Sequence, residues 1–253
     1  MTASSPLVQT GLLAHRGASL LRPENTLESI AVTAEMGVLW IETDVRTTRD
    51  KKLVMVHDST LDRTTSGSGY VAQTDLAEIQ KLDAGSWMGP EFAGMKVPTM
   101  KAFLTDICAL GLSLQLEFKE DKGREEELVD LVCDELEEYW PADGPSKLFF
   151  SGFSERCLRR ASVRMPNVQR ALALTCVPRD PDRLAEETGV TIMHVQDDFT
   201  DEAALEAIRA SSVEFGVATV NDPQRARDLL DGGVQQVLTD DPQLLSNNRY
   251  VAA

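Results

Sequence analysis

The sequence lacks long apolar runs, and this absence excludes one class of protein. None of its apolar stretches approaches the about 20 residues that a helix needs to cross a bilayer. The N-terminus, MTASSPLVQTGLLAHRG, has no basic leader and only a three-residue apolar run, so we expect no signal peptide. The sequence therefore predicts a cytoplasmic protein without a stable membrane anchor.

Basic residues are also scarce. The chain has 25 Lys and Arg residues against 41 Asp and Glu residues, a formal net charge of −16. Nucleic acids and anionic membrane surfaces both favour Lys and Arg, so we expect neither as a partner. A phosphate-bearing small molecule stays compatible with this charge, because a bound metal ion reverses the sign of the local field.

Closely spaced cysteines are absent as well. The four cysteines are Cys108, Cys133, Cys157 and Cys176, and no two are near enough in sequence to indicate a zinc or redox pair. We expect reduced thiols. The composition leaves a monomer and a homodimer equally open.

The most informative stretch that is present is IETDVRTTRDKKLVMVHD, residues 41–58. Two alternating runs flank a polar tetrapeptide, residues 49–52, which is typical of a hairpin turn. A turn centred there pairs Asp44 with His57 and places Glu42, Asp44 and His57 on one face. Two such carboxylates suit a hard divalent cation and a histidine suits proton transfer, although an ordinary exposed hairpin with an acidic face fits the pattern equally well.

The rest of the chain alternates short apolar runs with amphipathic helical segments. Eight strands are expected in a chain of 253 residues, which favours a (β/α)8 TIM barrel over an open sheet. We expect one domain over residues 8–248, with a small inserted subdomain after the second-strand hairpin, at about residues 63–99. A last helix is expected over residues 242–245. The expected strands begin at Gly11, Leu39, Ser113, Lys147, Arg170, Val190, Val213 and Gln235.

The barrel prediction gives chemical meaning to the polar residues that end its first three strands, because active sites in this fold lie at the C-terminal ends of the strands. His15 ends the first strand, Glu42 and Asp44 end the second, and Glu117 with Lys119 ends the third. A carboxylate in a barrel strand is costly unless it is paired or binds a metal.

These residues carry a resemblance to a known family. The segments AHRGAS (14–19), PENTLESI (23–30), IETDVRTTRD (41–50), VHDSTLDRTTSGSG (56–69), LEFK (116–119), TVNDPQ (219–224) and VLTDDP (237–242) resemble the glycerophosphodiester phosphodiesterases. The motifs occur in order from residue 14 to 242, and the closest likeness is to the compact cytosolic bacterial members.

The resemblance implies a barrel with an insertion after the second-strand hairpin, and one divalent cation, Mg²⁺ or Ca²⁺. It implies that Glu42, Asp44 and Glu117 hold the metal, that His15 and His57 are catalytic, and that Arg16 and Lys119 contact phosphate. The implied reaction is hydrolysis of a glycerophosphodiester to sn-glycerol 3-phosphate and an alcohol.

Several alternatives stay open. We take His15 as base and His57 as acid only as a working assignment, and the attacking group is either water or the neighbouring glycerol hydroxyl. A lysophospholipase D-type hydrolase on the same barrel and a catalytically silent phosphodiester-binding protein are the competing functions. The residues do not reveal the preferred head group.

Four further residues have weaker cases. His194 is interpreted as a structural histidine within a strand. Asn25 and Thr26 are expected to begin a helix, although Asn25 lies in the loop after the first strand, near the expected metal. Ala218 stands where many family members have an aromatic residue, which suggests a wider substrate pocket.

Overall fold

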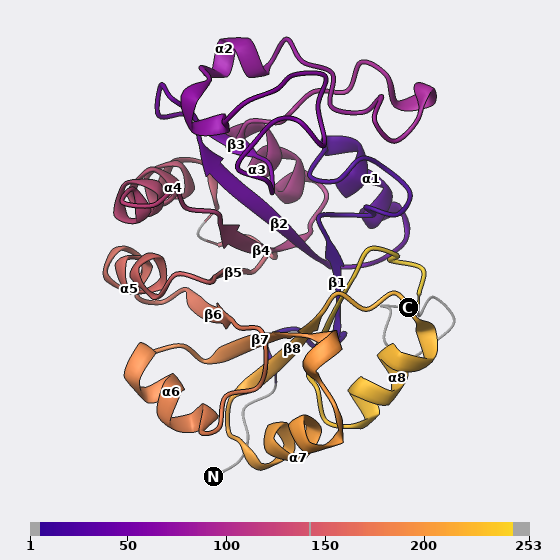
Figure 1. The fold of residues 1–253 in the computed structure, drawn as a ribbon, viewed down its shortest axis with the longest axis vertical. Helices are drawn as coiled ribbons and strands as arrows, with labels where there is room; N and C mark the ends of the chain where they lie inside the picture. The colour runs from indigo at the N-terminus through magenta and orange to yellow at the C-terminus, as the bar shows by residue number, and fades with distance from the viewer. Residues whose placement is uncertain (1–5, 142, 245–253) are drawn as a thin grey trace.

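The computed structural model describes residues 6–141 and 143–244, and its centre is a closed barrel of parallel strands (Figure 1). The strands follow the order β1-β9-β8-β7-β6-β5-β4-β2, and pairing of β1 with β2 closes the ring. This confirms the predicted (β/α)8 architecture. The barrel strands are β1 Leu12–His15, β2 Trp40–Thr47, β4 Ser113–Phe118, β5 Leu148–Gly152, β6 Gln169–Ala173, β7 Ile192–Gln196, β8 Glu214–Ala218 and β9 Gln236–Thr239.

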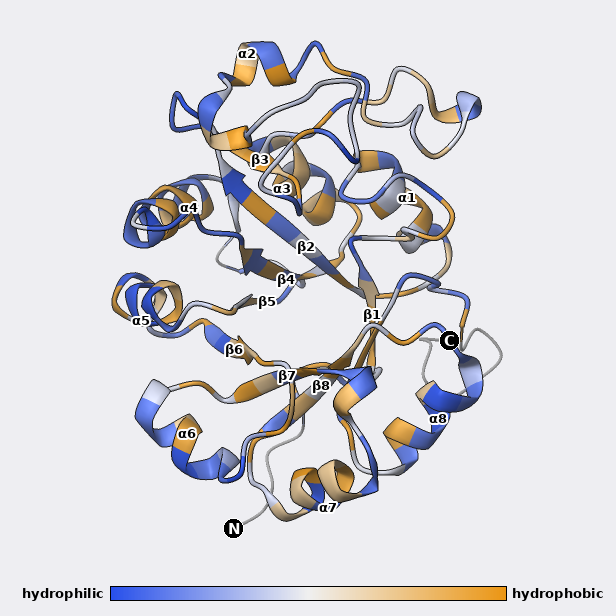
Figure 2. Cartoon of the chain, viewed as in Figure 1, coloured by the Kyte–Doolittle hydropathy of each residue, from blue (hydrophilic) through white to orange (hydrophobic). Residues whose placement is uncertain are grey.

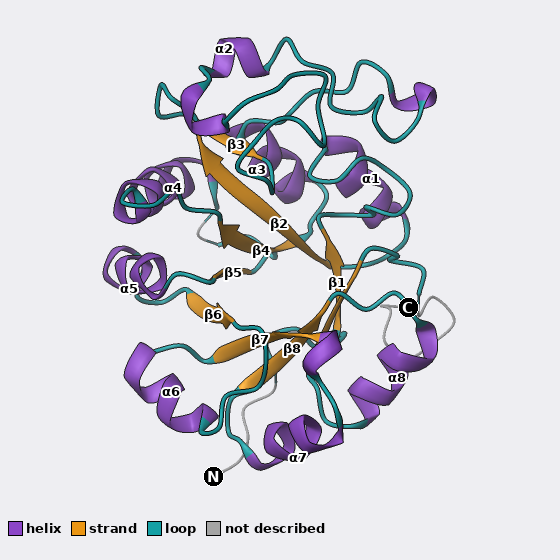
Figure 3. Cartoon of the chain, in the orientation of Figure 1, coloured by secondary structure: helices purple, strands orange, loops and turns teal. Residues whose placement is uncertain are grey.

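Helices surround the barrel and connect its strands (Figure 3). Capping side chains fix several of their starts: Thr26 accepts a hydrogen bond from the backbone N–H of Ser29, and Ser154 does the same for Cys157. Thr26, rather than Asn25, therefore caps the first helix. The surrounding helices are α1 Leu27–Glu35, α3 Met100–Ala109, α4 Glu125–Tyr139, α5 Glu155–Arg164, α6 Pro181–Thr188, α7 Glu202–Ala210 and α8 Pro223–Asp231.

Hydrophilic and hydrophobic residues alternate along β2 (Figure 2). Because successive side chains of a strand point to opposite faces, the barrel strands contribute to two separate apolar clusters. One large cluster contains strand residues such as Ile41, Leu116 and Phe150 together with the buried faces of the helices. A smaller cluster contains the intervening strand residues, among them Leu13, Trp40 and Phe149, and fills the barrel interior. Because the smaller cluster does not reach the C-terminal ends of β2 and β4, polar residues occupy the interior there.

The hairpin register differs from our expectation by one residue. Thr47 pairs with Leu53 and Val45 with Met55 on β3 Leu53–Met55, so Asp44 lies opposite Val56 rather than opposite His57. The connection is a five-residue loop, residues 48–52, in which Lys51 has a φ of 59°. His57 follows the end of β3, and its side chain reaches the barrel mouth without being part of the ladder.

The segment after β3 contains only short elements, η1 Val71–Gln73, α2 Leu76–Ile79 and η2 Pro90–Phe92. It has its own small apolar cluster, which includes Leu61, Ile79 and Val97. The treatment of residues 63–99 as a separate inserted subdomain stays a prediction, as does the single domain over residues 8–248.

Two remaining expectations concern the chain end and membranes. Pro242 to Leu244 form a turn instead of beginning a helix, and Leu245 lies outside the described residues. Among residues 6–141 and 143–244, no helix combines the length and the hydropathy that crossing a bilayer requires.

The outer apolar layer gives a prediction for stability. Phe150 is fully buried, and its ring lies 5.0 Å from that of Phe118, centroid to centroid. We expect Phe150→Ala to lower the free energy of unfolding by about 3–5 kcal/mol, because it leaves a cavity between the barrel and the helices. Urea unfolding measures this change. Val163→Ala, at a side chain that is 69% exposed, serves as the control and should stay within about 0.5 kcal/mol of the original protein.

Candidate active site at the C-terminal mouth of the barrel

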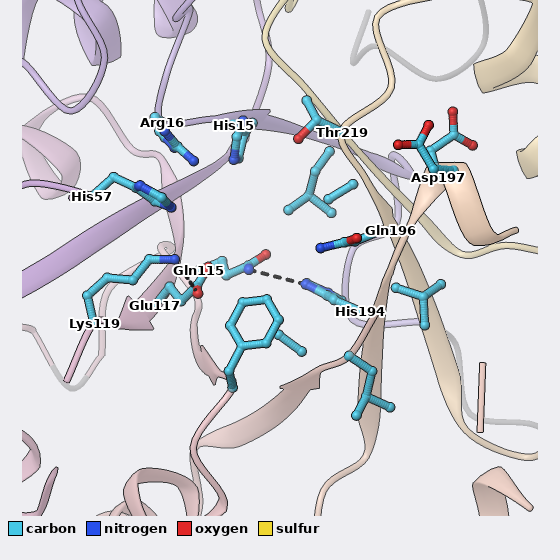
Figure 4. Close-up of a pocket in the computed structure, with 17 residues that line it drawn as sticks. His15, Arg16, His57, Gln115, Glu117, Lys119, His194, Gln196, Asp197 and Thr219 are labelled. Carbon is cyan, nitrogen blue, oxygen red and sulfur yellow. Dashed lines mark hydrogen bonds and ion pairs between the residues drawn. The ribbon is translucent and has the colours of Figure 1, made fainter. Parts of the chain in front are cut away.

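A cavity of about 350 Å³ opens at the C-terminal mouth of the barrel (Figure 4). Most of its charged lining comes from the first half of the chain, and includes His15, Arg16, His57, Glu117 and Lys119. The second half contributes small and apolar side chains, such as Ala173, Leu174, Val195 and Ala218, with Gln196, Asp197 and Asp198. The cavity thus has one charged side and one mainly uncharged side.

Three carboxylates meet beside this cavity. Glu42, Asp44 and Glu117 each offer an oxygen, and these oxygens all lie within 4.8 Å of one another. The side chains of Glu42 and Asp44 are only 1% exposed, and Glu42 Oε1 and Asp44 Oδ1 have no hydrogen-bond partner among the described residues. Buried carboxylate oxygens that make no hydrogen bond suit a hard divalent cation, so the residues present fit Mg²⁺ or Ca²⁺.

The loop after β1 holds the two acids of β2 in place. The backbone N–H of Arg16 donates to Glu42 Oε2 at 3.1 Å, and Asn25 Nδ2 donates to Asp44 Oδ2 at 2.9 Å. Arg16 and Asn25 both have positive φ angles, 56° and 57°, in the left-handed region that ordinary residues rarely adopt. This strained loop holds one carboxylate oxygen of each acid by a hydrogen bond. The other oxygen of each acid makes no hydrogen bond within the described residues.

Two cationic side chains lie against the same carboxylates. Lys119 Nζ is 2.6 Å from Glu117 Oε1 and 3.3 Å from Asp44 Oδ1, and Arg16 Nε is 3.4 Å from Asp44 Oδ2. Burial alone would raise the pKa of Asp44, but the charges of Lys119 and Arg16 hold it below its usual value. Burial and the charge of Asp44 raise the pKa of Glu42.

Each of the two expected catalytic histidines is oriented by a carboxylate. His15 Nδ1 lies 2.7 Å from Asp240 Oδ1, and His57 Nδ1 lies 2.8 Å from Asp58 Oδ1. A carboxylate accepts, so the neutral rings carry their protons on Nδ1 and leave Nε2 for a ligand. His15 Nε2 is 3.9 Å from Glu42 Oε2, beside the three carboxylates.

The surroundings shift the two histidine pKa values in opposite directions. Burial would lower the pKa of His15, but the hydrogen bond to Asp240 and the charge of Glu42 raise it overall. Burial is also the largest influence on His57, and the charges of Lys119 and Arg16 add to it, so its pKa is lowered despite Asp44. The two rings are therefore suited to different protonation states at one pH.

The structure brings all seven expected site residues together, and it adds partners that the sequence reasoning missed. Asp240 directly follows β9, so the general position of active sites at strand ends was a usable signal for it. Arg63 was not identifiable in this way. It joins Asp58 to Glu24, which itself pairs with Arg16 Nη1 at 2.9 Å, and so links the segment after β3 to the loop after β1.

The sequence also matches a known protein family and several of its members. Residues 15–244 match the model of the glycerophosphoryl diester phosphodiesterase family. A glycerophosphodiester phosphodiesterase of Caldanaerobacter subterraneus is 31% identical over 95% of this chain and 98% of its own length. A second, from Bacillus subtilis, is 32% identical over 92% of this chain and 84% of its own length.

A solved structure agrees with these relatives. A phosphodiesterase of Oleispira antarctica, in complex with the product sn-glycerol-3-phosphate, superposes with a TM-score of 0.88. It is 34% identical in sequence, over 92% of this chain and 93% of that one. A glycerophosphodiester phosphodiesterase of Agrobacterium tumefaciens is 26% identical with a TM-score of 0.76, over 93% and 98% of the two chains.

The contact between His15 and Asp240 gives a prediction for titration. We expect Asp240→Asn to lower the pKa of His15, because it removes both the charge and the strong acceptor that favour the imidazolium. The chain has only 3 histidines, so a nuclear magnetic resonance titration can follow the signals of each imidazole ring. A chelator in the buffer keeps divalent cations from binding during the titration.

Asp241→Asn is the matched control for this titration. It removes the same charge from the neighbouring position, and its side chain accepts from the backbone N–H of Gln243 rather than from His15. A His15 pKa that stays constant or rises in Asp240→Asn, compared with the control, would contradict the described role of Asp240.

Proposed function

Because the chain belongs to the glycerophosphoryl diester phosphodiesterase family, we propose that it hydrolyses glycerophosphodiesters to sn-glycerol 3-phosphate and an alcohol. The observation that carries this proposal is the convergence in one cavity of three carboxylates, two oriented histidines and two cationic side chains. Hydrolysis of a phosphodiester needs charge neutralisation at phosphorus together with proton transfer at the attacking and leaving oxygens.

In the proposed site Glu42, Asp44 and Glu117 hold one divalent cation, Mg²⁺ or Ca²⁺. When bound, the cation supplies Lewis-acid neutralisation of a phosphoryl oxygen. Arg16 and Lys119 contact the remaining phosphate oxygens, Arg16 through its planar guanidinium and Lys119 as a point charge. Arg16 is itself held by Glu24 and Lys119 by Glu117, which keeps both at the cavity wall before substrate arrives.

The two histidines move protons in the proposed reaction. One ring accepts the proton of the attacking oxygen at Nε2 while the other donates a proton to the alkoxide that leaves when the P–O bond breaks. Asp240 and Asp58 stabilise the imidazolium form of His15 and His57 respectively, as carboxylates at Nδ1. Our working assignment keeps His15 as base and His57 as acid, whereas the raised pKa of His15 and the lowered pKa of His57 favour the reverse order. Whether water or the glycerol hydroxyl attacks is left open.

A lysophospholipase D-type activity is the second candidate, because an exposed aromatic side chain stands at the cavity. Phe153 lines the cavity and is 55% exposed, so an acyl chain on the glycerol has an apolar surface to contact. This candidate uses the same acids and histidines, and it differs only in which diester the cavity admits.

Release of sn-glycerol 3-phosphate tests the proposed function. We expect release from glycerophosphocholine or glycerophosphoethanolamine with Mg²⁺ or Ca²⁺, and none in a chelator. His15→Ala should reduce kcat by about 10²–10⁴-fold, the usual size of an acid or base contribution. Glu42→Ala should abolish both activity and the heat of metal binding in calorimetry.

Glu155→Gln is the control for Glu42→Ala, since it removes a carboxylate that is 55% exposed on α5. It should leave activity and metal binding unchanged. If lysophosphatidylcholine alone is cleaved, the second candidate replaces the first. If neither class of diester is cleaved with either metal, the hydrolase assignment fails, and a phosphodiester-binding role is the next to be tested.

A further inference from the structure

A chain of hydrogen bonds crosses the barrel interior beneath the cavity, through side chains that the proposed reaction does not use. Glu214 on β8 accepts from Gln236 Nε2 on β9 at 3.3 Å, and Gln236 Oε1 lies 3.0 Å from His194 Nε2 on β7. His194 Nδ1 lies 3.3 Å from Gln115 Nε2 on β4. The chain therefore runs from Glu214, which also accepts from the backbone N–H of Leu7, to the floor of the cavity.

Each bond in this chain fixes the direction of the next. A carboxylate at Glu214 only accepts, so Gln236 turns its NH₂ group toward Glu214 and its oxygen toward His194. His194 then donates from Nε2, which leaves Nδ1 as an acceptor for the NH₂ group of Gln115 (Figure 4). The second N–H of that group is directed at Ser151 Oγ, at 2.9 Å. Reversing the Gln115 amide would place two acceptors against each other.

The result is an acceptor that has no partner. Gln115 is 1% exposed and lines the cavity, and its Oε1 makes no hydrogen bond within the described residues. Gln115 lies opposite Glu42 in the ladder between β4 and β2, two residues before Glu117. A buried amide oxygen without a donor costs free energy, so a ligand that donates a hydrogen bond fits this position.

Gly216 provides the space that the row of hydrogen-bonded side chains needs. A Cβ at Gly216 would lie 2.6 Å from Cδ2 and 2.8 Å from Nε2 of His194, closer than any side chain allows. The ring of His194 thus lies directly over the β8 backbone and can reach Gln236. His194 is buried with both ring nitrogens in hydrogen bonds, and burial lowers its pKa to about 4, so it stays neutral.

We propose that the amide oxygen of Gln115 accepts a hydrogen bond from a hydroxyl group at the reaction centre, and that His194, Gln236 and Glu214 position it for this role. The proposal rests on the proposed function. The hydroxyl belongs either to the glycerol part of the substrate or to the attacking water, and both donate in the same way. His194 then acts as a positioning residue rather than as a third acid or base.

The donor and acceptor roles in this row of hydrogen bonds can be measured without enzymatic turnover, from the tautomer of His194. With ¹⁵N-labelled histidine, neutral His194 should carry its proton on Nε2, whereas His15 and His57 should carry theirs on Nδ1. In Glu214→Gln the amide at position 214 can donate or accept, so the His194 signals should move toward a mixture of tautomers. A His194 that carries its proton on Nδ1 in the original protein would overturn the proposal.

Steady-state kinetics test whether the amide oxygen of Gln115 contributes a hydrogen bond during the reaction. We expect Gln115→Met to lower kcat/KM for glycerophosphocholine about ten-fold, the effect of one lost hydrogen bond to a reacting group. Glu214→Gln should lower it by a smaller factor, and should have no further effect when combined with Gln115→Met. A loss confined to glycerol diesters, with bis(p-nitrophenyl) phosphate unaffected, assigns the hydroxyl to substrate, and an equal loss with both substrates assigns it to water.

Gln235→Met is the matched control, because Gln235 makes its hydrogen bonds to the backbone of Phe215 and Gly233 and is not part of the hydrogen-bonded row from Glu214 to Gln115. It should leave kcat/KM and the histidine tautomers unchanged. Values of kcat/KM within two-fold of the original protein for Gln115→Met would overturn the proposal.

Binding of sn-glycerol 3-phosphate by calorimetry separates this proposal from the proposed function. If no diester is cleaved but Gln115→Met weakens this binding, the hydroxyl contact stands and the hydrolase assignment fails. If no diester is cleaved and binding is the same in the variant, both fail.

Discussion

The structure depends on keeping three carboxylates together in a barrel interior that excludes most water. Three such groups within 4.8 Å repel one another, and burial adds to the cost. Arg16 and Lys119 offset part of this repulsion, and the backbone N–H of Arg16 and the amide of Asn25 take one oxygen of Glu42 and of Asp44. The strained loop after β1 follows from this requirement, since it must bring Arg16 and Asn25 to two neighbouring acids.

The same constraint organises the barrel below the site. Apolar side chains such as Trp40 and Phe149 fill the interior at the level where the strands begin, and polar side chains replace them toward the mouth. Between the two, Gln115 and His194 are buried and hydrogen-bonded to each other. On β4 Gln115 separates Glu117 from the apolar layer, whereas on β2 Glu42 lies at the same level as Gln115.

Much of this was predictable from the sequence, because local patterns carry it. Strand periodicity located the barrel strands, and the rule that sites lie at strand ends selected His15, Glu42, Asp44, Glu117 and Lys119. The hairpin register was wrong by one residue, since the left-handed conformation of Lys51 sets the loop length and no glycine marks it. The bond from His15 to Asp240 joins residues 225 positions apart, and only the closure of the barrel brings them together.

The cavity described above is divided along the chain, and this division bears on how substrate range can diverge. Most of its charged lining comes from segments before residue 120, and its small and apolar lining, Ala173, Leu174, Val195 and Ala218 among it, comes from segments after residue 170. Substitutions at these small and apolar positions can reshape the wall without touching an acid, a cation or either proton-carrying histidine. A duplicated copy of this gene could therefore acquire a new substrate by drift in its second half alone, and mutagenesis libraries for altered selectivity can be confined to that half.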